Sequence, residues 1–472
     1  MSEALPDGGR ATAGATEAIA RFISSTSLPD LPADAVEKSK KAIADTFAAI
    51  LAGAGSELAG PLLRYVREAG ESGASPILGT GMTAGAETAA LVNGAFGHAL
   101  DFDDVLSMMP AHPSAVILAA VLADLDGRSV SGRSLIEAYA LGVEVGGKIG
   151  LGITNQHYQR GFHATGTLAL FSAVTALARL RGLDVATTRQ AFGIAGSMAS
   201  GLRRNFGTMT KPLHTGIAAR SALTAVRLAA SGFTAAPDVL EAKAGFFAAY
   251  GTDASDPGVT VAALGRPFVV VDPGLALKKF PCCYACHRGM DGLLALRGEL
   301  AFDAGSVERV TCRMPPGGML VLTYPRPATG LEGKFSLEYC LAAGVLDGRY
   351  GLASFTDAAV RRREILALYD RITAMEDAAC RGDDPQFEKR SSGSRGHVEV
   401  EVVLKDGRRG GTRVVHPPGH PRRELSWDDL KAKFADCAAH AAIPAERGER
   451  AFTALVALER VDDLRSLAGL VA

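Results

Sequence analysis

The sequence predicts a mainly α protein with one smaller α+β region near its C-terminus. From residue 15 to about 245 apolar residues recur at helical spacing, and no run alternates with a period of two. After Asp272-Pro273-Gly274 the pattern changes to short alternating runs, and beyond Pro417-Pro418-Gly419 it is helical again. We therefore predict a large all-helical domain formed by residues 15–273 and 423–472, and an α+β domain formed by residues 274–422. Residues 1–14, which are polar and rich in Gly and Ala, are predicted to be a disordered extension.

The helices of the first half follow one another closely. Residues 38–51 form an amphipathic pattern with Ile43 and Phe47 on its apolar face, and Gly53 is expected to end this helix. Residues 86–100 and 114–125 are small or aliphatic nearly all round, which is typical of buried helices. Further helices are expected over residues 131–149, 166–181 and 215–231, with glycines at the expected ends: Gly152, Gly182 and Gly232.

The α+β region is predicted from its strand-like runs. Residues 307–314 (VERVTCRM) and 397–404 (HVEVEVVL) alternate, and Asp406-Gly407 before residues 411–416 indicates a β-hairpin. Residues 335–346 are predicted to form a helix between the strands, and the charged stretch 381–395 a mobile loop. Ser426 is expected to cap the first C-terminal helix, because Asp428 and Asp429 follow in its first turn.

The composition excludes several classes of protein. The 50 Lys and Arg residues balance 51 Asp and Glu residues, so no surface for nucleic acid or an anionic membrane is predicted. No apolar run reaches the length of a membrane span, and no secretory leader is recognisable. The seven cysteines are an odd number and do not predict a disulfide framework. We expect a cytoplasmic protein in which locally placed cations bind any anionic substrate.

Two stretches of the first half contain acids and histidines that could carry chemistry. Residues 97–114 (GHALDFDDVLSMMPAHPS) place Asp101 and His112 beside an apolar helix, where acids are costly unless they are paired or functional. Helix capping is an equally good interpretation of these acids. His163, in YQRGFHATGT, precedes a helix, and the alternative interpretation is a partly buried histidine with satisfied hydrogen bonds.

Two further stretches offer cations. Lys211 precedes Pro212 and is therefore expected in an extended or turn conformation, where with His214 and the following helix it would form an anion site. A solvated loop lysine is the alternative. Tyr324 and Arg326 lie between prolines that stiffen their loop, and a surface turn is the alternative there.

The segment LKKFPCCYACHR contains a possible metal motif that we discount. Cys283, Cys286 and His287 form a Cys-x-x-Cys-His run, but no second cysteine pair lies at the spacing of a structural zinc site, and haem attachment would require export. The preceding Lys278 and Lys279 are better candidates for binding carboxylates. The chain also lacks a P-loop, a dinucleotide fingerprint and a nucleophile elbow, so no metal and no cofactor are predicted.

Taken in order, the motifs GHALDFDD, GFHATGTL, GTMTKPLHTGIAAR, KKFPCCYACH and EGKFSLEY resemble the MmgE/PrpD family, over residues 15 to 460. This resemblance implies a helical domain completed by the C-terminal helices, an inserted α+β lid, a homodimer, and an active site between domain and lid without metal or cofactor. It implies a lyase, dehydratase or decarboxylase, that acts on a small di- or tricarboxylate such as cis-aconitate or 2-methylcitrate. An epimerase or racemase of an imino- or amino-dicarboxylate such as iminodisuccinate is one alternative, and a non-catalytic binding protein on the same fold is another.

The resemblance also implies roles for individual residues. The active-site acid of the family matches Asp101, which would orient an imidazole, and its histidines match His112, the principal acid or base, and His163, its partner. Lys211 and Lys278 match the carboxylate-binding lysines. Tyr324 matches a lid tyrosine that could protonate the opposite face of the substrate. His214, Cys283 and Arg326 are added as substrate-binding candidates.

Two positions depart from the pattern of the decarboxylase branch. Val105 stands where that branch has Thr, and Cys283 stands roughly where it has His. The loop between Asp104 and His112 is also one residue longer. The reaction and the substrate therefore stay open at this point.

Overall fold

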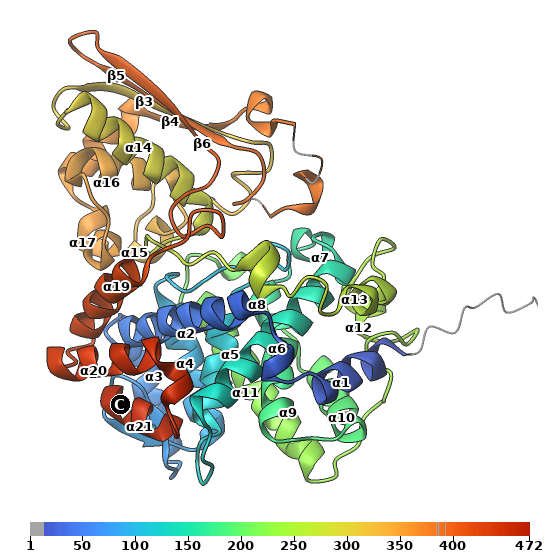
Figure 1. Cartoon of the computed structure of the whole chain (residues 1–472). Helices are drawn as coiled ribbons and strands as arrows, with labels where there is room; N and C mark the ends of the chain where they lie inside the picture. Colours follow the sequence, from blue (N-terminus) through green and yellow to red (C-terminus); the bar gives the residue numbers. More distant parts are fainter. Residues whose placement is uncertain (1–13, 384, 386, 392) are drawn as a thin grey trace, which may run out of the picture.

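The computed structural model describes residues 14–383, 385, 387–391 and 393–472. The predicted disordered extension, residues 1–14, lies outside this part apart from Gly14. Figure 1 shows a helical body and, above it, a smaller lobe that contains a sheet. The chain is mainly helical with a small mixed sheet in its C-terminal region, as predicted.

The helical body is built from N-terminal helices that pack side by side. Their bounds are α1 (Ala15–Ser25), α2 (Ala33–Ala54), α3 (Ala59–Ala69), α4 (Ala86–Ala99), α5 (Pro113–Ala123), α6 (Gly132–Ile153), α7 (Gln156–Gln159), α8 (Ala164–Thr167), α9 (Ala169–Leu180), α10 (Val185–Gly196), α11 (Thr210–Ala230), α12 (Phe246–Tyr250) and α13 (Pro257–Ala263). The helices predicted as apolar all round, α4 and α5, are buried along nearly their whole length, because they contact helices on several sides.

Small residues bring the central helices close together. A Cβ atom on Gly53 would lie 2.0 Å from the carbonyl oxygen of Phe96 in α4, and one on Gly94 would lie 2.8 Å from the Cα of Gly216 in α11. The prediction that Gly53 ends its helix is therefore wrong: α2 continues to Ala54, and the glycine serves the helix–helix contact.

Of the other three glycines predicted to end helices, two follow a helix and one lies inside a helix. Gly182 and Gly232 follow α9 and α11 with φ of 62° and 89°, the left-handed conformation that favours glycine after a helix. Gly152 lies inside α6, where a Cβ atom would approach the Thr260 hydroxyl to 2.3 Å, so that prediction is wrong. A short hairpin, β1 (Ser75–Ile77) with β2 (Met82–Ala84), also interrupts the first half, and its strands are too short to show alternation.

The sheet lobe confirms the predicted strands and adds one. Its strands are β3 (Val307–Met314), β4 (Ile372–Glu376), β5 (Val398–Leu404) and β6 (Arg409–Val414), in the order β4-β3-β5-β6. β5 and β6 form the predicted antiparallel hairpin, with Gly407 at φ 87° in its turn, whereas β4, parallel to β3, was not predicted. The helices of this lobe are α14 (His287–Leu300), α15 (Gly330–Gly333), α16 (Leu337–Asp347), α17 (Asp357–Val360) and α18 (Arg363–Leu368).

The charged stretch 381–395, predicted as a mobile loop, contains buried side chains. Phe387 and Arg395 are buried among the described residues of this stretch. The hydroxyl of Ser394 lies 2.6 Å from that of Ser107, which belongs to the helical body. Residues 384, 386 and 392 of the stretch lie outside the described part of the chain.

The C-terminal helices return to the helical body, as expected. They are α19 (Trp427–His440), α20 (Ala445–Val456) and α21 (Leu464–Val471), and Ser426 caps α19 together with Asp429. The Nζ atom of Lys433 donates to Asp45 of α2 at 2.6 Å and to the carbonyl oxygen of Phe102 at 2.7 Å. One hydrophobic core joins these helices to the N-terminal ones, and a second core fills the sheet lobe. The boundaries at residues 273 and 422 stay predictions.

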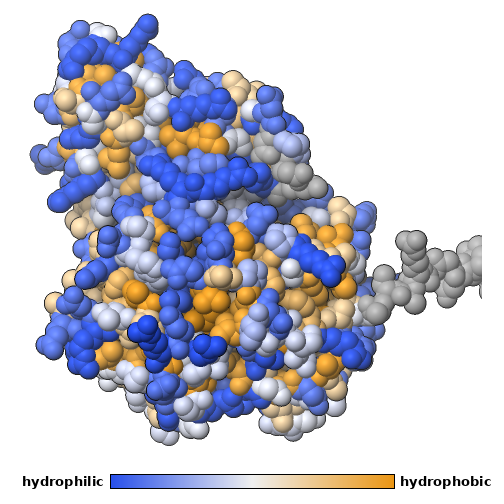
Figure 2. Space-filling view, viewed as in Figure 1, coloured by the Kyte–Doolittle hydropathy of each residue, from blue (hydrophilic) through white to orange (hydrophobic). Residues whose placement is uncertain are grey.

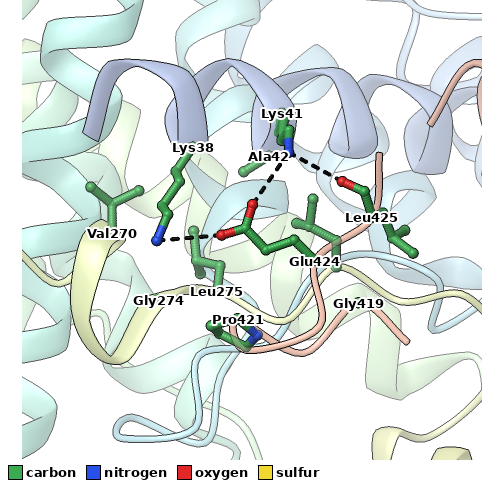
Figure 3. Close-up of a pocket in the computed structure, with 11 residues that line it drawn as sticks. Lys38, Lys41, Ala42, Val270, Gly274, Leu275, Gly419, Pro421, Glu424 and Leu425 are labelled. Atoms are coloured by element: carbon green, nitrogen blue, oxygen red, sulfur yellow. Dashed lines mark hydrogen bonds and ion pairs between the residues drawn. The ribbon is translucent and has the colours of Figure 1, made fainter. Parts of the chain in front are cut away.

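The two connections between body and lobe cross on α2, as Figure 3 shows. Leu277 of the entering segment donates from its backbone nitrogen to the Gly419 oxygen of the returning segment at 2.9 Å. Glu424 forms ion pairs with Lys38 at 3.4 Å and with Lys41 at 3.2 Å. This crossing fixes the backbone immediately before Lys278.

Within the described part, no single helix has both the length and the apolar character of a membrane span; the bent pair α2 and α3 passes by length and composition only. Figure 2 shows apolar patches over the helical body and mainly hydrophilic side chains across the junction between body and lobe.

Candidate active site

A cleft of about 520 Å³ lies between the helical body and the sheet lobe. It unites most of the residues that the sequence singled out, although they come from segments far apart in the chain. Its lining residues are Asp101, Val105, Pro110, His112, Tyr158, His163, Phe206 and Lys211 from the body, Lys278, Cys283, Tyr284 and Ala285 from the entering segment, and Val321, Phe335, Ser391 and Gly393 from the lobe.

Asp101 is the ionic centre of this cleft. Its φ of 51° is a left-handed conformation, which among non-glycine residues Asp tolerates comparatively well. Both its carbonyl oxygen, at 2.8 Å, and its carboxylate accept hydrogen bonds from Nζ of Lys278. Nζ of Lys211 lies 3.3 Å from the same carboxylate oxygen. Burial alone would raise the pKa of Asp101, but the two lysines outweigh burial and hold it well below its usual range.

Lys211 lies in the first turn of α11, not in the extended or turn conformation that was predicted from Pro212. Proline is accepted in a first turn because the backbone nitrogens there have no partner inside the helix. Nζ of Lys211 donates to Nε2 of His98 at 2.6 Å, and Nδ1 of His98 lies 2.9 Å from both carboxylate oxygens of Asp103. His98, at the end of α4, was not among the predicted site residues. Its place in the GHALDFDD motif, three residues before Asp101, is the signal that could have identified it.

His112 stands immediately before α5 with a fixed tautomer. Its Nδ1 lies 2.5 Å from the carbonyl oxygen of Asp104, which can only accept, so Nδ1 carries the proton. Nε2 is then unprotonated and lies 3.9 Å from the carboxylate of Asp101. Burial holds the pKa of His112 well below its usual range, so the ring is neutral and its free nitrogen can accept a proton.

His163 and His214 form a pair at one wall of the cleft. Their Nδ1 atoms are 3.0 Å apart, so one ring donates and the other accepts. Burial lowers the pKa of both, that of His214 to about 4. His163 lines the cleft as predicted, whereas His214 is not among the lining residues and contacts His163.

The three acids of DFDD have different environments. Asp104 accepts from the hydroxyl of Ser114, and burial raises its pKa to about 8. Burial also raises the pKa of Asp103, whose partner is His98. Asp101 alone is flanked by two ammonium groups and has its pKa lowered. The capping interpretation of these acids is wrong for Asp101, whose carboxylate is bound by side chains.

The two lobe residues predicted from the proline-flanked loop do not line the cleft. The Tyr324 hydroxyl donates to the carbonyl oxygen of Phe206 at 2.8 Å, and Arg326 is exposed and paired with Asp370 at 2.7 Å. The Arg326 side chain points to solvent in this structure, and its role in binding substrate stays a prediction. Tyr158 supplies a phenol to the cleft instead, and burial raises its pKa.

The structure separates the cysteines of the discounted metal motif. Cys283 lines the cleft, and burial raises the pKa of its thiol to about 12. Cys286 lies apart from it, in a buried group with Cys282 and Cys340. A second group of possible metal donors, His98, Asp101, Asp103 and His112, lies in the cleft itself. Because the ammonium groups of Lys211 and Lys278 already contact this second group, its environment suits a bound anion better than a cation.

The chain was compared with known proteins. The model of the MmgE/PrpD N-terminal domain matches residues 17–257, and that of the C-terminal domain matches residues 280–457. The chain is 28% identical to cis-aconitate decarboxylase of Mus musculus, over 89% of this chain and 86% of the relative. It is also 28% identical to cis-aconitate decarboxylase of Aspergillus terreus, over 78% and 79% of the two chains. Its match to 2-methylcitrate dehydratase of Salmonella typhimurium, 28% identical, covers 46% and 45%.

The two family models together span most of the chain, and the motifs predicted to carry the resemblance are those that line the cleft. The chain therefore belongs to the MmgE/PrpD family.

Proposed function

We propose that this protein is a cofactor-independent lyase that acts on a small polycarboxylate. The observation that carries the proposal is the convergence of Lys211 and Lys278 on one carboxylate oxygen, that of Asp101, inside a cleft next to a neutral histidine. Two ammonium groups and one carboxylate leave a net positive charge for a substrate carboxylate. In such a partly dry site each ion pair is stronger than in water.

The lysines stabilise the charge that develops during reaction. In a decarboxylation the carbon–carbon bond to one carboxylate breaks, carbon dioxide leaves without the electron pair, and the pair forms an enolate-type anion beside a second carboxylate. In a dehydration a base removes the α-proton, the same kind of anion forms, and the carbon–oxygen bond then breaks while an acid protonates the leaving hydroxide, which departs as water. Lys211 and Lys278 stabilise the enolate in either case.

His112 moves the proton. Its Nε2 carries no proton and faces the cleft, where it can remove an α-proton. A bound polycarboxylate adds negative charge beside the ring, which raises the pKa of His112 and favours the protonated ring that a decarboxylation needs as proton donor. Tyr158, with its phenol in the same cleft, is a second candidate donor. Tyr324 contacts Phe206 and would act only after the lobe has moved.

The coverage of the relatives supports decarboxylation as the first candidate. The two decarboxylases match 89% and 78% of this chain, whereas the dehydratase matches 46% of it. Val105 and Cys283, the two departures from the decarboxylase pattern, both line the cleft, so we propose a substrate that differs from cis-aconitate where it meets these side chains. None of the relatives reported above is named as an epimerase, and that alternative becomes an outcome of the test. A homodimer and a cytoplasmic location stay predictions.

Proton NMR in deuterated water tests the proposal with cis-aconitate, trans-aconitate, citrate, 2-methylcitrate and iminodisuccinate. A new vinyl signal from a shortened product supports a decarboxylase, and conversion of a hydroxy acid to its alkene supports a dehydratase. Deuterium at an α-carbon without a change of formula contradicts the lyase and favours an epimerase. The His112→Gln variant should be inactive, and the Arg326→Gln variant, changed outside the cleft, should act as wild type. A folded wild-type protein that converts none of the five would contradict the substrate class.

A further inference from the structure

A second recess, on the sheet lobe, is distinct from the cleft and lined by cationic side chains. Its lining includes four arginines and three histidines: Arg381, Arg390, Arg413, Arg422, His397, His416 and His420. Asp383 is the one acid among its described lining residues. Arg413 and Arg422 are exposed, and their side chains form no ion pair within the described part of the chain. Arg381 pairs with Glu388 at 3.3 Å, so Arg413 and Arg422 are the guanidinium groups that this recess offers to a bound anion.

His416 and His420 lie in a turn of the segment that returns to the helical body. Their rings are stacked, with centroids 4.1 Å apart. Nδ1 of His420 accepts from the backbone nitrogen of Arg422 at 3.0 Å, so its other ring nitrogen, Nε2, carries the proton and is a donor. Burial, then His416 and Arg422, lower the pKa of His420 to about 3, so the ring is neutral near pH 7.

Arg288 of α14 stands behind the recess and is completely buried. Its Nη1 donates to the carbonyl oxygens of Arg395, at 2.9 Å, and of Gly396, at 3.0 Å, and Gly396 lines the recess. Its Nε and Nη2 have no hydrogen-bond partner within the described part of the chain. A buried guanidinium without a carboxylate is costly, and an anion bound in front of it would offset that cost.

The recess and the active-site cleft share one loop. Ser391 and Gly393 line the cleft, whereas Ser394 and Gly396 line the recess. The turn with His416 and His420 also contains Gly419, whose carbonyl oxygen accepts from the backbone nitrogen of Leu277 in the entering segment. An anion in the recess would thus contact both the loop that contains Ser394 and Gly396 and the segment that returns to the helical body.

We propose that this recess is a second anion site, which binds a small multiply charged oxyanion, a polyphosphate or polycarboxylate, independently of the reaction in the cleft. Arg413 and Arg422 supply exposed guanidinium groups for charge-assisted hydrogen bonds, the histidine pair supplies a neutral donor, and Arg288 supplies buried positive charge behind them.

Histidine NMR on the full chain tests the site directly, because the reporter groups lie inside it. The ring signals of His416 and His420, assigned with His416→Gln and His420→Gln variants, are followed during titration with pyrophosphate and, separately, with citrate. At least one of the two anions is expected to shift the ring signals of both histidines until the shift saturates. Saturation by pyrophosphate alone assigns the site to phosphates, and saturation by citrate alone assigns it to polycarboxylates.

A double variant, Arg413→Gln with Arg422→Gln, is expected to weaken this binding at least about tenfold. Arg409→Gln is the matched control, because Arg409 lies on the same strand and is exposed but does not line the recess. It should bind as wild type. The proposal is overturned if sodium chloride at equal ionic strength causes the same shifts, or if the folded double variant binds with unchanged affinity.

Discussion

The Nζ atom of Lys211 lies 2.6 Å from Nε2 of His98, although the two residues are 113 positions apart in the sequence. An ammonium group can only donate, so Nε2 accepts and the proton of the neutral ring is on Nδ1, directed at Asp103. Asp103, His98 and Lys211 thus form a chain of hydrogen bonds, and Lys211 in turn forms an ion pair with Asp101 at 3.3 Å. This chain holds the Lys211 ammonium group at the floor of the cleft.

His98 is therefore expected to act as a positioning residue. The His98→Phe variant removes the acceptor and should raise KM for the polycarboxylate by about tenfold, with a smaller effect on kcat, because Lys211 is no longer held in place. The His98→Gln variant keeps an acceptor and should lose less. Steady-state kinetics of the two variants measure the difference. A fall in kcat at unchanged KM would argue against this role.

The roles of Tyr158 and Tyr324 can be compared by making the same substitution at each. Tyr158→Phe removes the phenol that lines the cleft and should lower kcat by about a hundredfold if Tyr158 transfers a proton. Tyr324→Phe removes only a hydrogen bond to the Phe206 carbonyl and should lower stability by about 1 kcal/mol with little change in kcat. Kinetics and urea unfolding of both variants test this assignment. The reverse pattern would restore Tyr324 as the proton donor and require movement of the lobe.

Gly53 should be essential for packing of α2 on α4. A methyl group in Gly53→Ala would lie 2.0 Å from the Phe96 carbonyl oxygen, a backbone atom that cannot move without shifting α4, so a loss of about 3 kcal/mol or more is expected. Gly60→Ala is the control: it also lies in a helix, α3, but its nearest neighbour is a flexible arginine end at 3.6 Å. That change should be neutral or stabilise by up to about 1 kcal/mol. Equal effects of the two substitutions on the free energy of unfolding would contradict this account.

Lys334 predicts a distinct pH dependence of stability. Its side chain is buried, its Nζ has no hydrogen-bond partner within the described residues, and burial lowers its pKa to about 8. The folded pKa is below the unfolded value of 10.5, so the charged lysine destabilises the fold fully below about pH 8, and stability recovers as the pH rises from 8 towards 10.5.

Lys334→Met keeps the length of the side chain and removes the charge. It should stabilise the protein at pH 7 by up to roughly 3 kcal/mol, and the advantage over wild type should shrink between pH 8 and 10. Urea unfolding of both proteins across this range measures the difference. An advantage that is constant with pH would show that the charge of Lys334 is compensated in the fold.

Much of the fold could be predicted because it depends on local patterns. The apolar helices α4 and α5, the strands β3 and β5, the Asp406-Gly407 turn and the Ser426 cap all follow from periodicity or from the conformation of a single residue. Strand β4 and the hairpin of β1 with β2 were missed, because three to five residues are too few for a visible period.

The candidate site, too, could be predicted only in part. Six of the predicted residues line the cleft together: Asp101, His112, His163, Lys211, Lys278 and Cys283. Their residue types and motif order could be read from the sequence. The positions of Arg326 and Tyr324 could not, because a proline-flanked loop can present its side chains to the cleft or to solvent. The helical conformation of Lys211 was missed because a residue before proline is usually extended. Proline is accepted in the first turn of a helix, however, and Lys211 and Pro212 lie in the first turn of α11.

The sequence by itself determined the elements, the family resemblance and the set of charged groups. Only the tertiary structure decided how those charges are paired. It sets Lys211 between Asp101 and His98, closes the cleft with residues 391 and 393, and leaves Arg288 buried without a carboxylate in the described part of the chain. The reason is physical: helix and strand periods depend on neighbours a few residues apart, whereas pairing and burial of charge depend on atoms that only the folded chain brings together.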